Sequence, residues 1–297
     1  MKGKLGWALV TVGAAVGLTG CGISVLGGTP AKHAPKPIRP AYIVPTAKGS
    51  LAETAPSVQG VVWVLAGSTT AKALYQVSLS SRKIVGSVSV TGAATSVALS
   101  PTGQLALGAG SGNVGFVQFL DSQTGSVQQT VPLGGAVRCL VASADGSTFY
   151  ALDVTSKSAS VSLISAQTGK VTSTLPAALD AVSIVPTPDG SGIYYLEPNG
   201  NVSEIATVGG QVETTFSVGT AGRSLAISPD GSTLYVLKGT AAQTNIAVVD
   251  LATQGVKRAL PAAADSAQIA ISPNGTDLYD LVGTPTLGNL QAVKIPS

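Results

Sequence analysis

Short apolar runs recur from about residue 60 onward, separated by turns rich in Gly, Pro, Asp and Ser. One unit contains a more polar, alternating run, Val212–Phe216, and three apolar runs, Ser224–Ile227, Leu234–Leu237 and Ile246–Val249. Continuous apolar runs favour strands buried on both faces, whereas alternation favours a strand with one face near water. The pattern therefore predicts four-stranded sheets with three buried strands and one outer strand.

A turn signature repeats between the first and second apolar runs. It occurs at Ser100-Pro101-Thr102-Gly103, Ser143-Ala144-Asp145-Gly146, Thr187-Pro188-Asp189-Gly190, Ser228-Pro229-Asp230-Gly231 and Ser272-Pro273-Asn274-Gly275. Pro presets φ, Gly accepts positive φ, and Asp or Asn bonds to the local backbone. The period of about 43 residues, in a chain of strands, is typical of a β-propeller. We expect Asp145, Asp189 and Asp230 to be turn formers.

The number of units predicts the number of blades. The second strand starts six times, near Val61, Gln104, Phe149, Ile193, Leu234 and Leu278. The last unit ends after its third strand, Leu290–Lys294, and Ala41–Thr46 is placed to supply the fourth, because Pro45 is tolerated on an edge. We therefore expect an all-β, six-bladed propeller over residues 41–297, closed by an N-terminal strand. A seven-bladed ring is the alternative.

The first 20 residues have the pattern of an export signal peptide. Lys2 and Lys4 precede an uncharged apolar run, Leu5–Val16, and small residues follow. Leu18-Thr19-Gly20-Cys21 resembles the lipobox of bacterial lipoproteins. The resemblance implies cleavage before Cys21, lipidation of Cys21 and anchoring at the outer face of the cytoplasmic membrane. Because the uncharged run continues to Leu26, an uncleaved transmembrane anchor is the alternative.

Residues 21–40 are expected to form a lipidated stalk. Four prolines and several basic residues favour an extended, solvated linker that can also rest against anionic headgroups: Pro30, Pro35, Pro37, Pro40, Lys32, Lys36 and Arg39. The net charge of +3 derives from this end of the chain. From residue 50 on there are 11 basic and 14 acidic residues, a balance of −3, and no basic stripe. We therefore predict no nucleic-acid partner.

The repeat resembles the YVTN-type β-propeller family of exported bacterial and archaeal proteins. The resemblance is carried by Ser228–Val236, by Val249–Thr253, and by Asp121–Gly125 in another unit, although no strand contains Tyr-Val-Thr-Asn in full. It implies a propeller over about 200 residues. Because relatives of this family include lactone-hydrolysing propellers, it also leaves a hydrolase open.

Few residues are suited to catalysis. His33 is the only histidine and lies in the stalk, which excludes Ser-His-Asp and Cys-His mechanisms and zinc sites built on several histidines. Gly110–Gly115 matches a dinucleotide fingerprint by letter, but a strand follows where a helix is needed. Cys139 lies in an apolar strand and is expected to be a small buried residue, unpaired once Cys21 is lipidated. We predict no catalytic residue, metal or cofactor.

One set of charged residues is a candidate binding site. Loops from a fourth strand to the next first strand carry Arg138, Asp180, Arg223 and Asp265. We expect them to bind a small anionic ligand or a carboxylate of an envelope protein, or alternatively to pair with one another. The predicted function is a non-catalytic binding or scaffolding lipoprotein. A lactonase-like hydrolase, with Asp153 and Glu197 as further acidic candidates, and an envelope sensor or assembly factor are the alternatives.

Overall fold

The protein is represented by a computed structural model, and every described element is a β-strand. The description covers residues 8–12, 23–25, 41–43, 61–67, 72–78, 81, 83–90, 93–122, 124–240, 243–264, 266–272, 275–283 and 288–295. Over these residues, no helix has the length and apolar character needed to cross a bilayer.

Five sheets have four antiparallel strands each, arranged in sequence order. One contains β2 (Ile23–Val25), β4 (Val61–Gly67), β5 (Lys72–Ser78) and β6 (Lys83–Val90). The next contains β7 (Ala94–Leu99), β8 (Leu105–Ser111), β9 (Val114–Leu120) and β10 (Val127–Leu133). Then come β11 (Ala136–Ala142), β12 (Thr148–Val154), β13 (Ala159–Ser165) and β14 (Val171–Ala177). The last two are β15 (Ser183–Pro186), β16 (Gly192–Leu196), β17 (Asn201–Ala206) and β18 (Val212–Ser217), and β19 (Gly222–Ile227), β20 (Thr233–Thr240), β21 (Gln243–Asp250) and β22 (Gly255–Pro261).

The remaining sheet has five strands and a different order. Its strands are β23 (Ser266–Ile271), β24 (Asp277–Gly283), β25 (Gly288–Lys294), β1 (Ala8–Val12) and β3 (Ala41–Ile43), in this spatial order. The structure thus has five four-stranded blades, and the prediction of six blades, or seven, is wrong. The described part of the predicted closing strand, Ala41–Ile43, is not beside β25, because β1 pairs antiparallel with β25 and β3 pairs parallel with β1. The run Ala-Leu-Val-Thr-Val in β1 has the β-branched composition that suits a paired strand.

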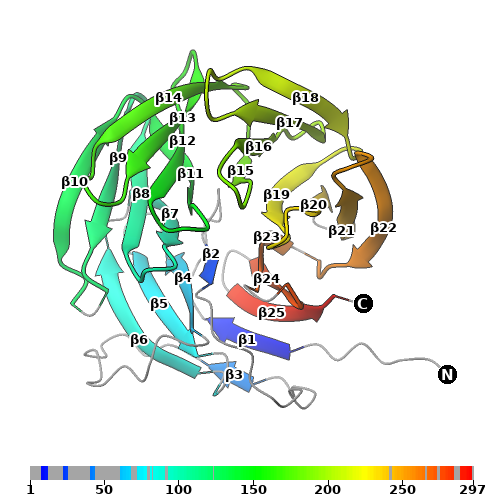
Figure 1. Ribbon diagram of the computed structural model, residues 1–297. Coiled ribbons are helices and arrows are strands. Elements are labelled where there is room, and N and C mark those ends of the chain that lie inside the picture. Colours follow the sequence, from blue (N-terminus) through cyan, green and yellow to red (C-terminus); the bar gives the residue numbers. More distant parts are fainter. Residues whose placement is uncertain are drawn as a thin grey trace.

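The sheets are arranged around a common centre as in a propeller (Figure 1). The first strands form the inner ring, since β2, β7, β11, β15, β19 and β23 each contact the next and β23 contacts β2. The fourth strands, β6, β10, β14, β18 and β22, lie at the outside of the ring (Figure 1). The predicted all-β propeller is confirmed.

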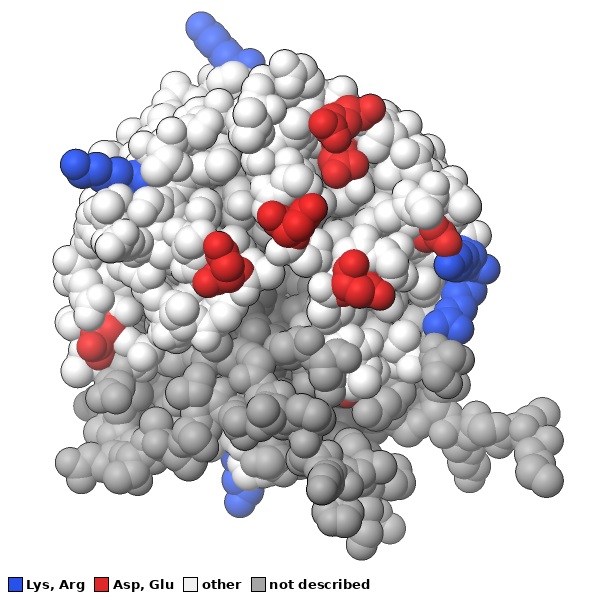
Figure 2. All heavy atoms as spheres, in the orientation of Figure 1, with Lys and Arg blue, Asp and Glu red and all other residues white. Residues whose placement is uncertain are grey.

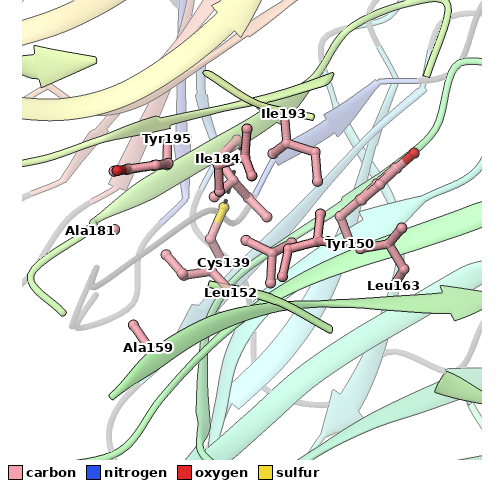
Figure 3. Close-up of a cluster of buried hydrophobic side chains, with 12 residues drawn as sticks. Cys139, Tyr150, Leu152, Ala159, Leu163, Ala181, Ile184, Ile193 and Tyr195 are labelled. Atoms are coloured by element: carbon pink, nitrogen blue, oxygen red, sulfur yellow. Dashed lines mark hydrogen bonds between the residues drawn. The ribbon is translucent and has the colours of Figure 1, made fainter. Parts of the chain in front are cut away.

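The hydrophobic core is divided into clusters between neighbouring sheets. In Figure 3, Cys139 and Leu152 from one blade face Ile184 and Ile193 from the next, and all four are buried. Phe119 and Phe149 belong to the preceding interface. Because both faces of the inner strands are covered in this way, these strands need the continuous apolar runs of the sequence.

The predicted turns are confirmed in atomic detail. Asp230 Oδ1 accepts hydrogen bonds from Ser228 Oγ (2.5 Å), Ser232 N (3.0 Å) and Ser232 Oγ (2.9 Å), and Gly231 has φ of 73°. These donors hold the pKa of Asp230 at about 2. Figure 2 shows acidic side chains spread over the face in view. Asp145 and Asp189 accept the same three bonds in their own turns.

Candidate functional site

Three of the inner strands carry a polar side chain at one register position, five residues before the first residue of the turn. Thr95 occupies it in β7, Arg138 in β11 and Arg223 in β19, and each lies where the pairing with the second strand shifts by one residue. A β-bulge of this kind turns one side chain away from the regular alternation. It therefore directs these three side chains to the neighbouring blade.

Each of these side chains donates to the main chain of the following blade. Arg138 Nη1 donates to Ala181 O at 2.6 Å, and Arg223 Nη1 donates to Ser266 O at 2.7 Å. Thr95 Oγ1 donates to Val137 O in the same way. The acceptor is in every case the residue six before the next turn, so the bond repeats with the blades.

Both arginines are half-buried, and we call them the arginine rim. Over the described residues, Nη1 is the one guanidinium nitrogen of each arginine with a hydrogen-bond acceptor. The Nε and Nη2 hydrogens lie on the other edge of the guanidinium, which is the edge that binds a carboxylate with two parallel bonds. The Nη1 side of each guanidinium is therefore used in a structural bond, whereas the Nε and Nη2 side has no acceptor among the described residues.

The acidic members of the predicted set are placed differently. Asp180 is exposed and forms no ion pair with Arg138, whose acceptors are the carbonyls of Leu179 and Ala181. Asp265 lies outside the described residues. An ion pair joins Lys257 on β22 and Asp250 at the end of β21, at 2.5 Å. The arginines are thus brought to equivalent positions, whereas Asp180 is not brought into contact with Arg138.

A second ring of interblade bonds lies one residue further along the inner strands. Ser96, Ser183 and Ser224 each accept, through Oγ, a hydrogen bond from a main-chain N–H of the next blade at 2.9–3.2 Å. Cys139 takes the corresponding position in β11 and has no exposed surface. Its burial was predicted correctly. In the unmodified full chain Cys139 is disulfide-bonded. The expectation of an unpaired thiol applies to the chain lipidated at Cys21 and stays a prediction.

Asp153 is at the end of β12 and is buried. Ser162 Oγ donates to its Oδ1 at 2.9 Å and Ser160 Oγ donates to its Oδ2 at 3.1 Å. Burial raises the pKa of Asp153, and the two serine hydroxyls oppose that shift.

The other acidic candidate, Glu197, accepts from Asn199 Nδ2 at 3.1 Å in a hairpin turn. No three His, Cys, Asp or Glu side chains of the described residues form a group that could hold a metal ion.

Close backbone packing explains the glycines of Gly110–Gly115. A Cβ on Gly115 would lie 1.8 Å from Gly135 O, and a Cβ on Gly110 would lie 2.4 Å from Val114 O. The hairpin of β8 and β9 therefore contacts the loop between β10 and β11, and that contact requires a glycine at position 115.

The sequence analysis missed one buried acid. Asp280, in the middle of β24, has no exposed surface, and its Oδ1 has no hydrogen-bond partner among the described residues. It follows a tyrosine in an otherwise apolar strand, so the local signal was a single charged residue at a core position.

Comparisons with known proteins bear on the fold. A hydrazine synthase structure from Kuenenia stuttgartiensis is similar, with a TM-score of 0.56 and 16 % identity, over 80 % of this chain and 92 % of that chain. This likeness shows a β-propeller fold. No family model matches the chain, and no curated protein does.

Proposed function

We propose that this propeller is a non-catalytic binding module, exported and anchored by lipid at Cys21 to the outer face of the cytoplasmic membrane, that binds carboxylates at its arginine rim. The proposal is supported by the hydrogen bonding of each guanidinium, in which, over the described residues, Nη1 is bonded to the protein and Nε and Nη2 are not. Nη1 of Arg138 and Arg223 is fixed to the next blade, so the side chain is held in place before any ligand arrives. A preorganised donor loses less conformational entropy on binding than a mobile one.

The ligand expected is a small dicarboxylate or acidic side chains of an envelope protein. The rim arginines are on blades separated by one blade, whose residue at the same register is the apolar Val182. Two cationic forks flanking an apolar position favour a ligand with two anionic ends and an apolar middle.

Binding is tested by titrating the full chain with succinate, adipate and acetate. The NMR signals of the arginine Nε–H groups report the binding. We expect saturable shifts with a dicarboxylate, lost in Arg138→Lys/Arg223→Lys because lysine keeps the charge but lacks the fork. Arg258→Lys, on the outer strand β22, is the matched control. Equal shifts in the rim and control variants would exclude the rim as a carboxylate site.

The anchor can be tested through the cysteines. The chain has two cysteines, so an intrachain disulfide of Cys139 and lipidation of Cys21 exclude one another. Intact mass of the protein from bacterial membranes should show a chain that begins at Cys21 and carries lipid, and Cys139→Ser should not change this. A full-length, unmodified chain whose mobility changes with reductant would contradict the anchor.

Cleavage before Cys21 would also remove β1 and leave the edge of β25 unpaired. We propose that Ala41–Ile43 then pairs with β25 in the exported chain, because it already lies in the same sheet, one strand further out. A chain starting at residue 21 should fold, and one starting at residue 47 should aggregate through the open edge. Equal solubility of the two would argue against this exchange.

A further inference from the structure

Asp280 is enclosed between β19–β22 and its own sheet. Leu278, two residues earlier and on the same face of β24, packs in the cluster with Leu237 and Ile246 of the preceding blade. Asp280 therefore faces that blade too, because side chains two apart share a face. Its side chain has no exposed surface, so it is shielded from bulk solvent.

Only one hydroxyl hydrogen is available for two short contacts at this position. Ser266 Oγ lies 2.7 Å from Ala263 O and 2.7 Å from Asp280 Oδ2. Ser266 Oγ is placed to donate to either oxygen, but it has one hydrogen and a carbonyl oxygen can only accept. Both contacts are hydrogen bonds at once only if Ser266 donates to Ala263 O and Asp280 itself supplies the hydrogen of the other contact.

The other oxygen of Asp280 also favours the neutral acid. Oδ1 has no donor among the described residues, and Oδ2 has one further, long contact, 3.5 Å from Ala263 N. A buried carboxylate with so few donors is more costly than a neutral acid in the same place. Burial raises the pKa of Asp280 to about 6, and the contacts with Ser266 Oγ and Ala263 N oppose that shift.

Two lysines on the preceding blade form contacts away from Asp280. Lys238 Nζ donates to Val218 O of the preceding blade, and Lys257 pairs with Asp250. Arg223 Nη1 donates to the carbonyl of Ser266, on the main chain of the residue that contacts Asp280. The other charged groups on these elements are Arg258 on β22, Asp277 on β24 and, outside the described side chains, Asp265 and Lys294.

We propose that Asp280 is held as a neutral acid that donates to Ser266 Oγ, and that its ionisation loosens the seam on which Arg223 is anchored. By the seam we mean the contacts between β19 and β23 made by Arg223 with Ser266 and by Ser224 with Ile269. The site is thus a pH-sensitive device built into the interface behind the arginine rim. It depends on the protein alone and not on whether the rim binds a ligand.

Stability against pH tests the protonation. The pKa of Asp280 is higher in the folded protein than in the unfolded chain. Its contribution to the free energy of unfolding is therefore complete below about pH 4 and is lost as pH rises to about 6. From pH 4 to pH 7 this lowers the folding equilibrium constant about a hundredfold. Asp280→Asn supplies an N–H donor to Ser266 Oγ at every pH, so we expect it to match the wild type near pH 4 and exceed it at pH 7. Parallel pH profiles of the two proteins would overturn the proposal.

Infrared spectra of the full chain, labelled at its aspartates, test the same point without relying on a variant that might misfold. A protonated carboxyl band should be present at pH 5, disappear by pH 8, and shift in frequency in Ser266→Ala, because its acceptor is removed. Absence of a protonated band at pH 5 would overturn the proposal.

Hydrogen exchange tests the seam. The exchange rate of amides in β23, divided by that of amides in β15, should rise between pH 5 and pH 8 in the wild type and stay constant in Asp280→Asn. The intrinsic rate of amide exchange depends on pH in the same way for both strands, so this dependence cancels in the ratio. A constant ratio in the wild type would show that ionisation does not loosen the seam.

Discussion

Two buried aspartates on second strands, Asp153 in β12 and Asp280 in β24, differ in their donors. They lie ten and eight residues after the first residue of their turns, and hence on the same face of the strand. Asp153 receives a hydroxyl hydrogen on each oxygen, whereas Asp280 shares one serine with a carbonyl. Burial is thus common to both carboxyls, and what distinguishes them is the supply of hydrogens, from which the proposed difference in protonation follows.

The largest effect is expected when each carboxyl is replaced by leucine. Asp153→Leu leaves the hydroxyls of Ser160 and Ser162 without their acceptor, which should cost about 3 kcal/mol of unfolding free energy at pH 7. Asp280→Leu leaves Ser266 bonded to Ala263, so its cost should be below about 1 kcal/mol. Urea unfolding at pH 7 measures both. The opposite order would show that Asp280, and not Asp153, is the buried acceptor.

Intermediate effects are expected at the interblade bonds of the inner ring. Removing the guanidinium in Arg138→Ala or Arg223→Ala should cost about 2 kcal/mol, because a charged donor is lost from a partly buried carbonyl. Thr95→Val removes a neutral donor at the same register and should cost about 1 kcal/mol. Arg258→Ala, an exposed control, should stay within about 0.5 kcal/mol of the wild type. If the Arg138→Ala and Arg223→Ala variants unfold at the same urea concentration as Arg258→Ala, the bonds from the arginines to the main chain do not contribute to stability.

The parts of the fold predicted from sequence are those fixed by local chemistry. The turn at Ser228–Gly231 has Pro, Asp and Gly within four residues, and its hydrogen bonds were implied by the position of Asp in that turn. The apolar runs likewise identified the buried strands. The strand beside β25 could not be identified, because β1 and β3 both offer short uncharged runs and only the pairing in space distinguishes them.

The candidate site was predicted in its residues but not in its contacts. The shared register of Arg138 and Arg223 is visible in the sequence, but their acceptors are main-chain carbonyls 43 residues away, and every residue has a carbonyl. The disulfide of Cys139 and the single donor near Asp280 also depend on long-range packing. Sequence periodicity aligns equivalent positions, whereas the partner at each position is decided by the neighbouring blade.

The smallest effect is expected at the turn aspartates, and its sign is opposite to that of Asp280. Three donors hold the pKa of Asp230 at about 2, below the unfolded value of 3.8, so its contribution is complete above about pH 4 and is lost as pH falls toward 2. Asp230→Asn should therefore melt below the wild type at pH 5, and the gap should close near pH 2. Melting temperatures over pH 2–5 measure this, with Asp180→Asn, an exposed aspartate outside the turns, as the control. A gap that persists at pH 2 would mean that the amide distorts the turn, and that the charge of Asp230 is not what its three donors stabilise.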